Sequence, residues 1–326
     1  MGDKTTRREF LRNMALTGAA LSLPGIVNAT AGTANTSGKT RVVIATDASS
    51  LTADNAVVQP VVEKMIARGV AKLTRSNTGV DGWKKLFSPK DVVGIKINCL
   101  FGKGVSTRPE MVNAVIAGLK SAGVKEDNII VWDRSSVDLI KCGFVPNKDG
   151  AGVKYFADDN QWGPELQRGA FKGRISTIIS EKVTAIINMP ILKTHGITGI
   201  SGSLKNHYGS FDNPGNHHAN NCNPQLADFN AIPAVKNKTR LVVMDVLRPQ
   251  HSGGPGLQVK DQYNHCSVMV GTDPLAVDCI GLNIIQDKLK QLGQEPIAAK
   301  KVRWLASAQE RGVGTCELSK IELLRV

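Results

Sequence analysis

The run DVVGIKIN at 91–98 opens the pattern that decides the fold class, because its apolar and β-branched residues predict a strand. TRPE follows at 107–110, where threonine can cap a helix and proline suits its first turn, so a helix is expected over 110–121. The run NIIVW at 128–132 predicts the next strand. A strand, a helix and a strand in this order predict a parallel pair joined by a right-handed crossover.

The same alternation of strands and helices continues on both sides of this unit. Further strands are expected at 41–46, 183–189, 241–246, 266–270 and 321–326, and further helices at 59–74, 225–235, 274–292 and 302–308. The segment 83–87 is interpreted as a packed turn, and 210–225, which lacks a hydrophobic period, as a long loop. The pattern predicts an α/β fold with a largely parallel, doubly wound sheet.

The domain organisation follows from the same pattern. Residues 41–326 are expected to form a single α/β domain, with an inserted small subdomain near 138–173, where glycine, asparagine and aspartate interrupt the periodicity. Residues 32–40 consist of small and polar residues with one lysine, which is typical of a flexible tether.

The first 31 residues resemble a twin-arginine signal peptide. Arg7 and Arg8 precede phenylalanine and leucine, a modestly apolar stretch covers 14–27, and Ala29-Thr30-Ala31 suits cleavage. We therefore expect recognition by the twin-arginine export machinery, a mature chain that begins near Gly32, and a periplasmic location. The sequence contains no apolar run of the roughly 20 residues that a membrane helix needs, so the mature chain is expected to lack a transmembrane span.

The segment NMPILKTHGITGISGSLKNHYG at 188–209 concentrates residue types suited to chemistry. Lys193 and His195 flank Thr194, so in an extended chain they point to the same side. Lys205 and Asn206 follow a glycine- and serine-rich stretch whose backbone N–H groups could cradle an anion. The alternative is a solvated loop with surface lysines.

Other polar groups follow the expected strands, and the carboxyl ends of parallel strands share one edge of a sheet. These groups are Asp47, Lys96, Asn98, Asp133, Asp245 and Asp273. Lys96 and Asn98 are therefore candidate ligand-binding residues, although each aspartate could simply cap a helix or start a turn. Thr272 or Asp273 is expected to cap the helix that begins at Pro274 and carries Asp278.

A transition-metal site is a competing possibility. Imidazole and thiolate ligands suit zinc, iron or copper, and the candidate ligands are His195, His207, His217, His218 and Cys222. Their spacing matches no regular metal motif, and the six cysteines form no Cys-x-x-Cys pair, so no ferredoxin-type motif is present and the cofactor stays unknown. Buried free thiols are expected for most of the cysteines.

Composition narrows the classes of partner. The chain has 326 residues and a net charge of +13, which favours anionic ligands or an acidic partner. It has no lysine-rich tail and no basic repeat with interleaved aromatic residues, which argues against nucleic acid. It also lacks the glycine patterns of phosphate-binding loops and of the serine-hydrolase elbow.

Seven short motifs, in order, resemble the Domain of Unknown Function 362 family, whose members are often described as iron–sulfur-centre-like proteins. They are KINC, TRPEMV, VWD, INMPILKTH, SLKNHYG, GGPG and TDPLAVD. The likeness covers 41–285 and implies that Lys193, His195, Lys205 and Asn206 are shared loop residues and that Asp273 and Asp278 are a shared acidic pair. Many relatives carry a ferredoxin-type cysteine segment, and this chain departs from that pattern.

These observations predict an exported enzyme, with or without an assisting metal, whose crevice is built by 96–108, 190–223 and 250–278. Lys193 and Lys205 would hold a small anionic substrate, and His195 would be a general base or a metal ligand. Asp273 or Asp278 would orient a histidine or bind the metal. The alternative is a non-catalytic accessory protein that binds a cofactor or assists the assembly of a periplasmic redox partner.

Overall fold

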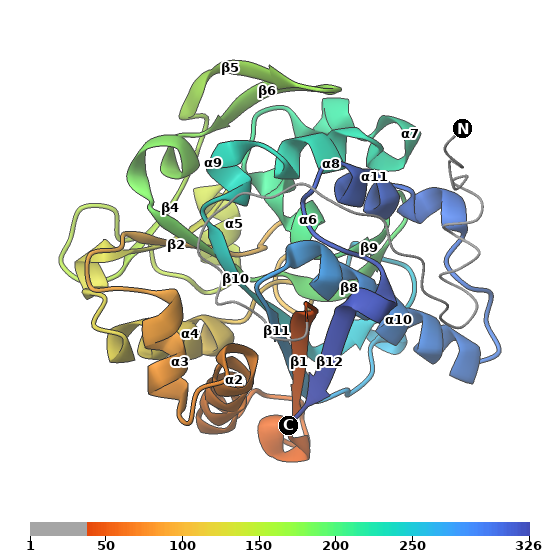
Figure 1. Ribbon diagram of the computed structural model, residues 1–326, viewed down its shortest axis with the longest axis horizontal. Coiled ribbons are helices and arrows are strands. Elements are labelled where there is room, and N and C mark those ends of the chain that lie inside the picture. The colour runs from red at the N-terminus through yellow and green to blue at the C-terminus, as the bar shows by residue number, and fades with distance from the viewer. Residues whose placement is uncertain (1–37) are drawn as a thin grey trace.

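The computed structural model describes residues 38–326, which form a ten-stranded sheet with helices on both faces (Figure 1). Its main path has the strand order β12-β1-β11-β10-β7-β2-β3-β4, and β8 and β9 extend it beside β10. All neighbours on this path pair in parallel except β11, which is antiparallel to both β1 and β10. The predicted α/β fold with a largely parallel sheet is confirmed.

The strands of the main sheet lie where apolar and β-branched runs occur in the sequence. They are β1 (Thr40–Thr46), β2 (Val93–Lys96), β3 (Ile129–Asp133), β4 (Lys154–Ala157), β7 (Ala185–Asn188), β8 (Ile191–His195), β9 (Gly199–Ser201), β10 (Thr239–Gln250), β11 (Ser267–Gly271) and β12 (Ile321–Arg325). Strands β2, β3 and β7 are buried throughout, as expected when helices cover both faces of a parallel sheet.

The helices cover the two faces of the sheet. They are α2 (Gln59–Thr74), α3 (Gly79–Leu86), α4 (Pro109–Ser121), α5 (Ser136–Lys141), α6 (Ser203–Asn206), α7 (Ala219–Cys222), α8 (Gln225–Asn230), α9 (Pro233–Lys236), α10 (Pro274–Gln291) and α11 (Trp304–Glu310). Helices α2, α3 and α4 gather on one face, and α8, α10 and α11 pack on the other (Figure 1).

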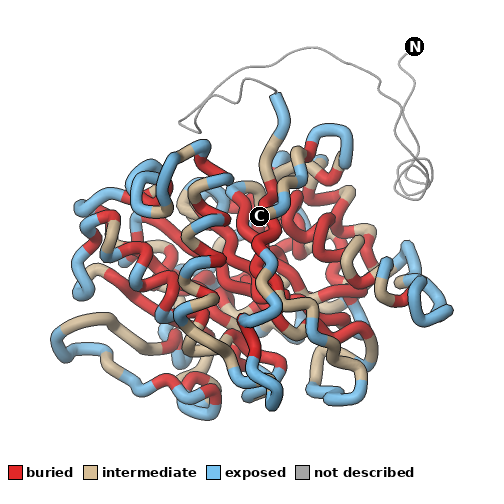
Figure 2. Tube along the Cα trace, turned by 90° about the horizontal axis from the view of Figure 1, so that it is seen from below, coloured by how far each residue is buried: buried red, intermediate tan, exposed pale blue. Residues whose placement is uncertain are grey.

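Strand β10 shows how one strand supplies both cores. Leu241 and Val243 belong to the core under α2 and α4, whereas Val242 and Met244 belong to the core under α10 and α11. This division follows from the two-residue period of a strand, which sends successive side chains to opposite faces. The buried residues accordingly run through the middle of the molecule, between two outer layers (Figure 2).

Two segments differ from the sequence-based expectation. The expected packed turn is the end of helix α3, whose N-cap Thr78 accepts a hydrogen bond from the backbone N–H of Asp81. Within the weakly periodic region, β4 joins the main sheet beside β3, and a separate antiparallel hairpin follows, formed by β5 (Trp162–Arg168) and β6 (Phe171–Ser176). The predicted inserted subdomain is therefore limited to this hairpin, because β4 pairs with β3 in the main sheet.

The lysine-bearing segment is more regular than a loop. Pro190 separates β7 from β8, and β8 resumes pairing with the same strand, β10, before it turns back as β9. The expected long loop at 210–225 contains a 3-10 turn, Pro214–His217, and the short helix α7. The helix expected at 225–235 is divided into α8 and α9, since Pro233 cannot continue the first one.

Four of the six cysteines are free, but only three of them are the buried free thiols expected for most of the set. Cys279 on α10 and Cys316 form a disulfide, while Cys99, Cys142 and Cys222 are buried free thiols and Cys266 is partly exposed. Among residues 38–326, no helix has the length and hydropathy that crossing a membrane requires. The predicted signal peptide lies outside the described residues and stays a prediction.

Candidate functional site

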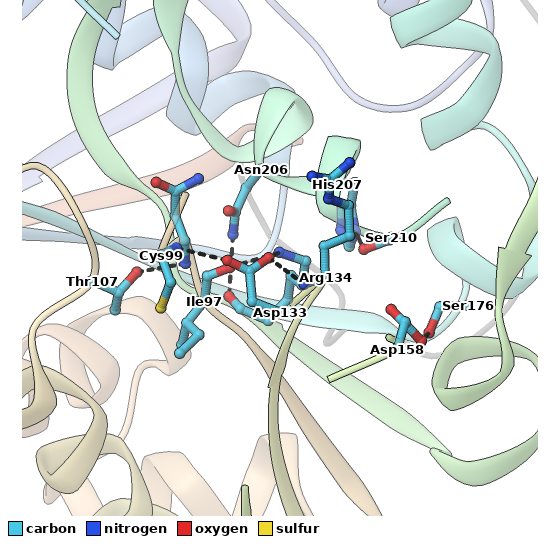
Figure 3. Close-up of polar contacts among 12 residues, drawn as sticks. Ile97, Cys99, Thr107, Asp133, Arg134, Asp158, Ser176, Asn206, His207 and Ser210 are labelled. Atoms are coloured by element: carbon cyan, nitrogen blue, oxygen red, sulfur yellow. Dashed lines mark hydrogen bonds and ion pairs between the residues drawn. The ribbon is translucent and has the colours of Figure 1, made fainter. Parts of the chain in front are cut away.

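The carboxyl ends of β2, β3 and β7 meet at one edge of the sheet, as predicted. Lys96 at the end of β2 forms a buried ion pair with Asp133 at the end of β3, with 2.7 Å between the Lys96 Nζ and Asp133 Oδ1 atoms. The Lys96 ammonium also donates to the carbonyl of Ile97 at 2.6 Å. Asp133 in turn accepts the backbone N–H of Cys99 at 2.6 Å (Figure 3). Lys96 is therefore a fully paired structural cation rather than a free ligand-binding group.

Asn206 ties the lysine-bearing segment to this edge. Its amide Nδ2 donates to the carbonyl of Lys96 at 3.1 Å and to Asn188 Oδ1 at 2.7 Å. Asn188 completes the link by donating to the carbonyl of Ser203 at 2.8 Å. These bonds position α6 over the ends of β2 and β7, so Asn206 holds the site together.

Lys193 and Lys205 lie near this edge and form no ion pair with any residue of 38–326. Lys193 is 2% exposed, and its Nζ donates to the carbonyl of Val105 at 2.6 Å and lies 5.2 Å from the Phe101 ring centre. Lys205 is half-buried, and its Nζ lies 3.4 Å from the ring centre of Tyr208. Two enclosed ammonium groups without an acidic partner are rare, because burial of a charge normally requires pairing.

Burial lowers the pKa of both lysines to about 8, which keeps them mostly protonated at pH 7. Three groups act against this shift: Asp133, which is already paired with Lys96, and Cys142 for Lys193, and Cys222 for Lys205; both cysteines are buried thiols. The enclosed positive charge is therefore available to an anion from outside.

His195 shares this crevice but cannot serve as the predicted general base in this arrangement. Its Nδ1 accepts the backbone N–H groups of Ile197 at 3.1 Å and Thr198 at 3.3 Å. The neutral ring therefore carries its proton on Nε2, which makes Nε2 a hydrogen-bond donor with no lone pair for a proton or a metal. Burial, followed by the Lys205 ammonium and other nearby cations, lowers the pKa of His195 to about 3.

His218 has the arrangement that sequence reasoning assigned to His195. Its Nε2 lies 3.3 Å from the Lys205 Nζ, and its ring is also hydrogen-bonded to the backbone at Gly215 and Pro214, which raises its pKa against the dominant lowering by burial. The Lys205 ammonium can only donate, so His218 Nε2 accepts from it and the neutral ring carries its proton on Nδ1. The rings of His195 and His218 stack 6.4 Å apart. Nothing in the local sequence distinguishes His218 from its neighbour, because the assignment depends on the fold.

The other metal candidates are not brought together. His207 is buried, with Nδ1 beside Ser210 Oγ at 3.2 Å, and His217 stacks on Phe171 at 4.9 Å between ring centres. Burial raises the pKa of the Cys222 thiol. Residues 38–326 contain no group of three or more histidine, cysteine, aspartate or glutamate side chains placed to hold a metal ion.

The acidic pair has structural roles. Asp278 on α10 accepts the backbone N–H groups of Ser203 at 2.5 Å and Leu204 at 3.0 Å, so the predicted anion cradle is filled by the protein's own carboxylate. A Cβ on Gly202 would lie 2.3 Å from Asp278 Oδ1, which explains the glycine there. Burial raises the pKa of Asp278 to about 7.

Asp273 lies at the opposite edge of the sheet, which corrects the expectation that it shares the crevice. It follows β11, the one antiparallel strand on the main path, and it caps α10 by accepting the backbone N–H of Ala276 at 2.9 Å. The predicted helix cap is thus confirmed, and a cap is also the simplest role for this residue.

The site that remains, which we call the lysine crevice, consists of Asn98, Lys193, His195, Lys205 and His218. Asn98 lies between the two lysines: its Oδ1 is 3.5 Å from Lys193 Nζ, and it lines a small pocket of about 30 Å³ with Lys205 and Ser201. Gly254 seals one side, because its carbonyl accepts the backbone N–H of Gly196 at 3.1 Å. The five residues come from two of the three predicted segments, 96–108 and 190–223, and the third segment, 250–278, contacts them only through the Gly254 carbonyl.

Comparison with known proteins identifies relatives only at the level of the domain. A structural-genomics crystal structure of a protein from Thermotoga maritima is similar over 71% of this chain at 12% identity and a TM-score of 0.37; the match spans 59% of that protein's length. No curated protein matches. The family model described as "Domain of unknown function (DUF362)" matches residues 93–283, which is more than half of the chain. The chain therefore belongs to the DUF362 family.

Proposed function

We propose that this protein is an enzyme that acts on a small anionic substrate, a carboxylate or a phosphate ester, held between Lys193 and Lys205. The observation that carries the proposal is the pair of enclosed ammonium groups without an acidic partner among the described residues. A bound anion would supply the missing negative charge, and charge-assisted hydrogen bonds are the stronger class.

Three groups of the crevice would complete the recognition and move a proton. The Nε2–H of His195 donates to the substrate, and Lys205 gives a proton to a developing negative charge. His218 accepts a hydrogen bond from the Lys205 ammonium. After Lys205 has given up its proton, His218 takes up a proton from solvent and passes it to Lys205. A general acid works best when its pKa lies near the working pH, and the pKa of Lys205, about 8, fits that role.

The test is a binding screen of phosphorylated and carboxylated small molecules by thermal shift, followed by calorimetry on each compound that raises the melting temperature. Lys193→Met and Lys205→Met keep the length of the side chain and remove its charge, and Lys260→Met, at an exposed lysine, is the control. A lost charge-assisted hydrogen bond costs about 1.5–3 kcal/mol, so each crevice variant should bind roughly 10- to 150-fold more weakly.

Turnover is then measured on the compound that binds, with product detected by mass spectrometry. His218→Asn should keep binding within a fewfold and lose most of the turnover. Unchanged affinity in both lysine variants, or the absence of any stabilising compound, would overturn the proposed site. Unchanged turnover in His218→Asn would remove only its proton-transfer role.

A further inference from the structure

A second cavity of about 380 Å³ opens on the α2–α4 side of the loop that follows β2. Its wall combines three segments that are far apart in the sequence, namely 55–57, 103–110 and 142–143. Neither Lys193 nor Lys205 lines it, so this cavity is distinct from the lysine crevice. We call it the thiol pocket, because one of its wall residues is Cys142.

Cys142 and Cys99 form a pair of adjacent free thiols at this wall. Cys142 lines the cavity and is itself only 3% exposed, whereas Cys99 lies behind it with no exposed surface. The two side chains share a hydrogen bond, and Cys142 Sγ also lies 3.5 Å from the Cys99 carbonyl. The outer thiol is therefore the one that a molecule in the cavity meets first, and the inner thiol is in place to react second.

The hydrogen bond from Cys99 lowers the pKa of Cys142 to about 7, while the Cys99 thiol has a raised pKa. Ser106 Oγ also stands beside Cys142 and lowers its pKa, although it makes no hydrogen bond of normal geometry. Burial of the thiol, followed by the carboxylates of Asp133 and Asp138, acts in the opposite direction. The lowered pKa favours the thiolate at Cys142 rather than at Cys99, and the thiolate is the reactive form.

The charged groups around the pocket favour a negatively charged ligand. Lys103 lies beside Gly143, the residue that follows Cys142. A Cβ placed on Gly143 would be 3.9 Å from the Lys103 Nζ. Arg108 and the N-terminus of the 13-residue helix α4, which has no side-chain cap, line the same wall. The Arg108 guanidinium is ion-paired with the buried carboxylate of Asp245, so the available positive charge comes from Lys103 and the α4 N-terminus, and Glu110 is the acidic residue of the lining.

We propose that the thiol pocket is a thiol–disulfide exchange site for small anionic disulfides, with Cys142 as the attacking thiol and Cys99 as the resolving thiol. The Cys142 thiolate forms a bond to one sulfur of the disulfide, and the other half leaves as a thiolate. Cys99 then attacks Cys142 Sγ in the mixed disulfide, the second half leaves, and the Cys99 proton passes to it. The protein pair is oxidised to a Cys99–Cys142 disulfide, and the visiting disulfide is reduced to two thiols.

The probe is oxidised glutathione, an anionic disulfide, and the comparison compound is cystamine, a cationic one. Full-length protein is incubated with each at equal concentration, remaining thiols are trapped with N-ethylmaleimide, and peptides are identified by mass spectrometry. Wild-type protein should accumulate the Cys99–Cys142 cross-link faster with oxidised glutathione. Cys99→Ser should stop at a mixed disulfide on Cys142, and Cys142→Ser should form neither product.

Two matched controls make the test specific. Lys103→Glu should slow the reaction with oxidised glutathione roughly threefold to tenfold and speed the one with cystamine, whereas Lys260→Glu, at an exposed lysine outside the pocket, should change neither. Cys266→Ser removes a partly exposed thiol and should leave the cross-link unaffected. Preferential reaction at Cys266, equal rates with both disulfides, or no Cys99–Cys142 peptide from wild-type protein would overturn the proposal. The wild-type readout holds even where a cysteine variant does not fold.

Discussion

Lys96 and Lys205 are both enclosed lysines at the same edge of one sheet, and their surroundings are opposite. Lys96 has a carboxylate at 2.7 Å and a carbonyl at 2.6 Å, and Gly209 lies so close that a Cβ there would be 2.9 Å from the Lys96 Nζ. Lys205 has an aromatic ring and an imidazole as its nearest partners and no carboxylate among the described residues. Lys96 has its counter-charge within the protein, whereas Lys205 has none among the described residues.

This difference separates structural from functional charge. A buried lysine whose donors are all satisfied stabilises the strands that carry it, and removing it leaves its partner unpaired. A buried lysine without a counter-charge lowers the stability of the folded chain, and such a cost is retained where a ligand offsets it. The two lysine types can therefore be told apart by the sign of the stability change when each is replaced.

The largest effect is expected at the paired lysine. Lys96→Met leaves the carboxylate of Asp133 buried without a cation, which should lower the free energy of unfolding by about 3–5 kcal/mol. Urea denaturation followed by circular dichroism measures it, with Lys260→Met as the exposed control. The double variant Lys96→Met with Asp133→Leu should recover part of the loss, and a single variant as stable as wild type would contradict the structural role.

A smaller change of opposite sign is expected at the unpaired lysine. Lys205→Met removes a buried charge whose pKa is lowered from 10.5 to about 8, so the free energy of unfolding at pH 7 should rise by about 1–3 kcal/mol. Below pH 8 the group is charged in both states and the gain is full. Between pH 8 and 10.5 only the unfolded wild-type chain keeps the proton, so wild-type stability rises with pH and the gain disappears.

Denaturation curves of both proteins at pH 7, 9 and 10.5 test this linkage. A variant that is less stable than wild type at pH 7 would show that the cation contributes to folding, as Lys96 does. The comparison between the two lysines would then fail.

The smallest effect is expected at His195, which supplies one neutral donor to the crevice. His195→Ala should weaken binding of the compound found in the screen by about 0.5–1.5 kcal/mol, or roughly twofold to tenfold. The affinity ratio between the two proteins should be flat from pH 5 to 7, because the pKa of His195 is about 3 and the ring stays neutral there. Calorimetry over that range measures it, and a ratio that rises towards pH 5 would mean that a charged imidazole binds the ligand.

The layout of the sheet could be predicted because each strand carries its own signal. The runs at 91–98 and 128–132 are mainly apolar, and Pro109 starts a helix between them, so β2, α4 and β3 follow from local patterns. The expected Thr107 cap is wrong: α4 has no side-chain cap, and the Thr107 hydroxyl donates to the Met189 carbonyl at 2.9 Å. The convergence of Lys96 and Asp133 then follows from parallel pairing.

The roles within the site could not be predicted in the same way, because each depends on contacts between distant segments. Asp278 fills the backbone cradle at 203–204 from 74 residues away, and the orientation of β11 moves Asp273 to the other edge. The protonation pattern of His195 depends on two backbone donors in the following turn. A sequence identifies the residues capable of such chemistry. Only the packing decides which of them keep a donor or acceptor atom that is not already hydrogen-bonded.

The number of residues around Pro190, between β7 and β8, is fixed by the pairing of the two strands with β10. Strands β7 and β8 pair with the same twelve-residue strand, with Val242 opposite Asn188 and Asp245 opposite Ile191. Removing one residue between these anchors would turn β8 over, so that Thr194 would face the crevice and both Lys193 and His195 would face away. Substitutions here can be absorbed one at a time, but a gap or an insertion of one residue turns away both side chains that β8 supplies to the crevice.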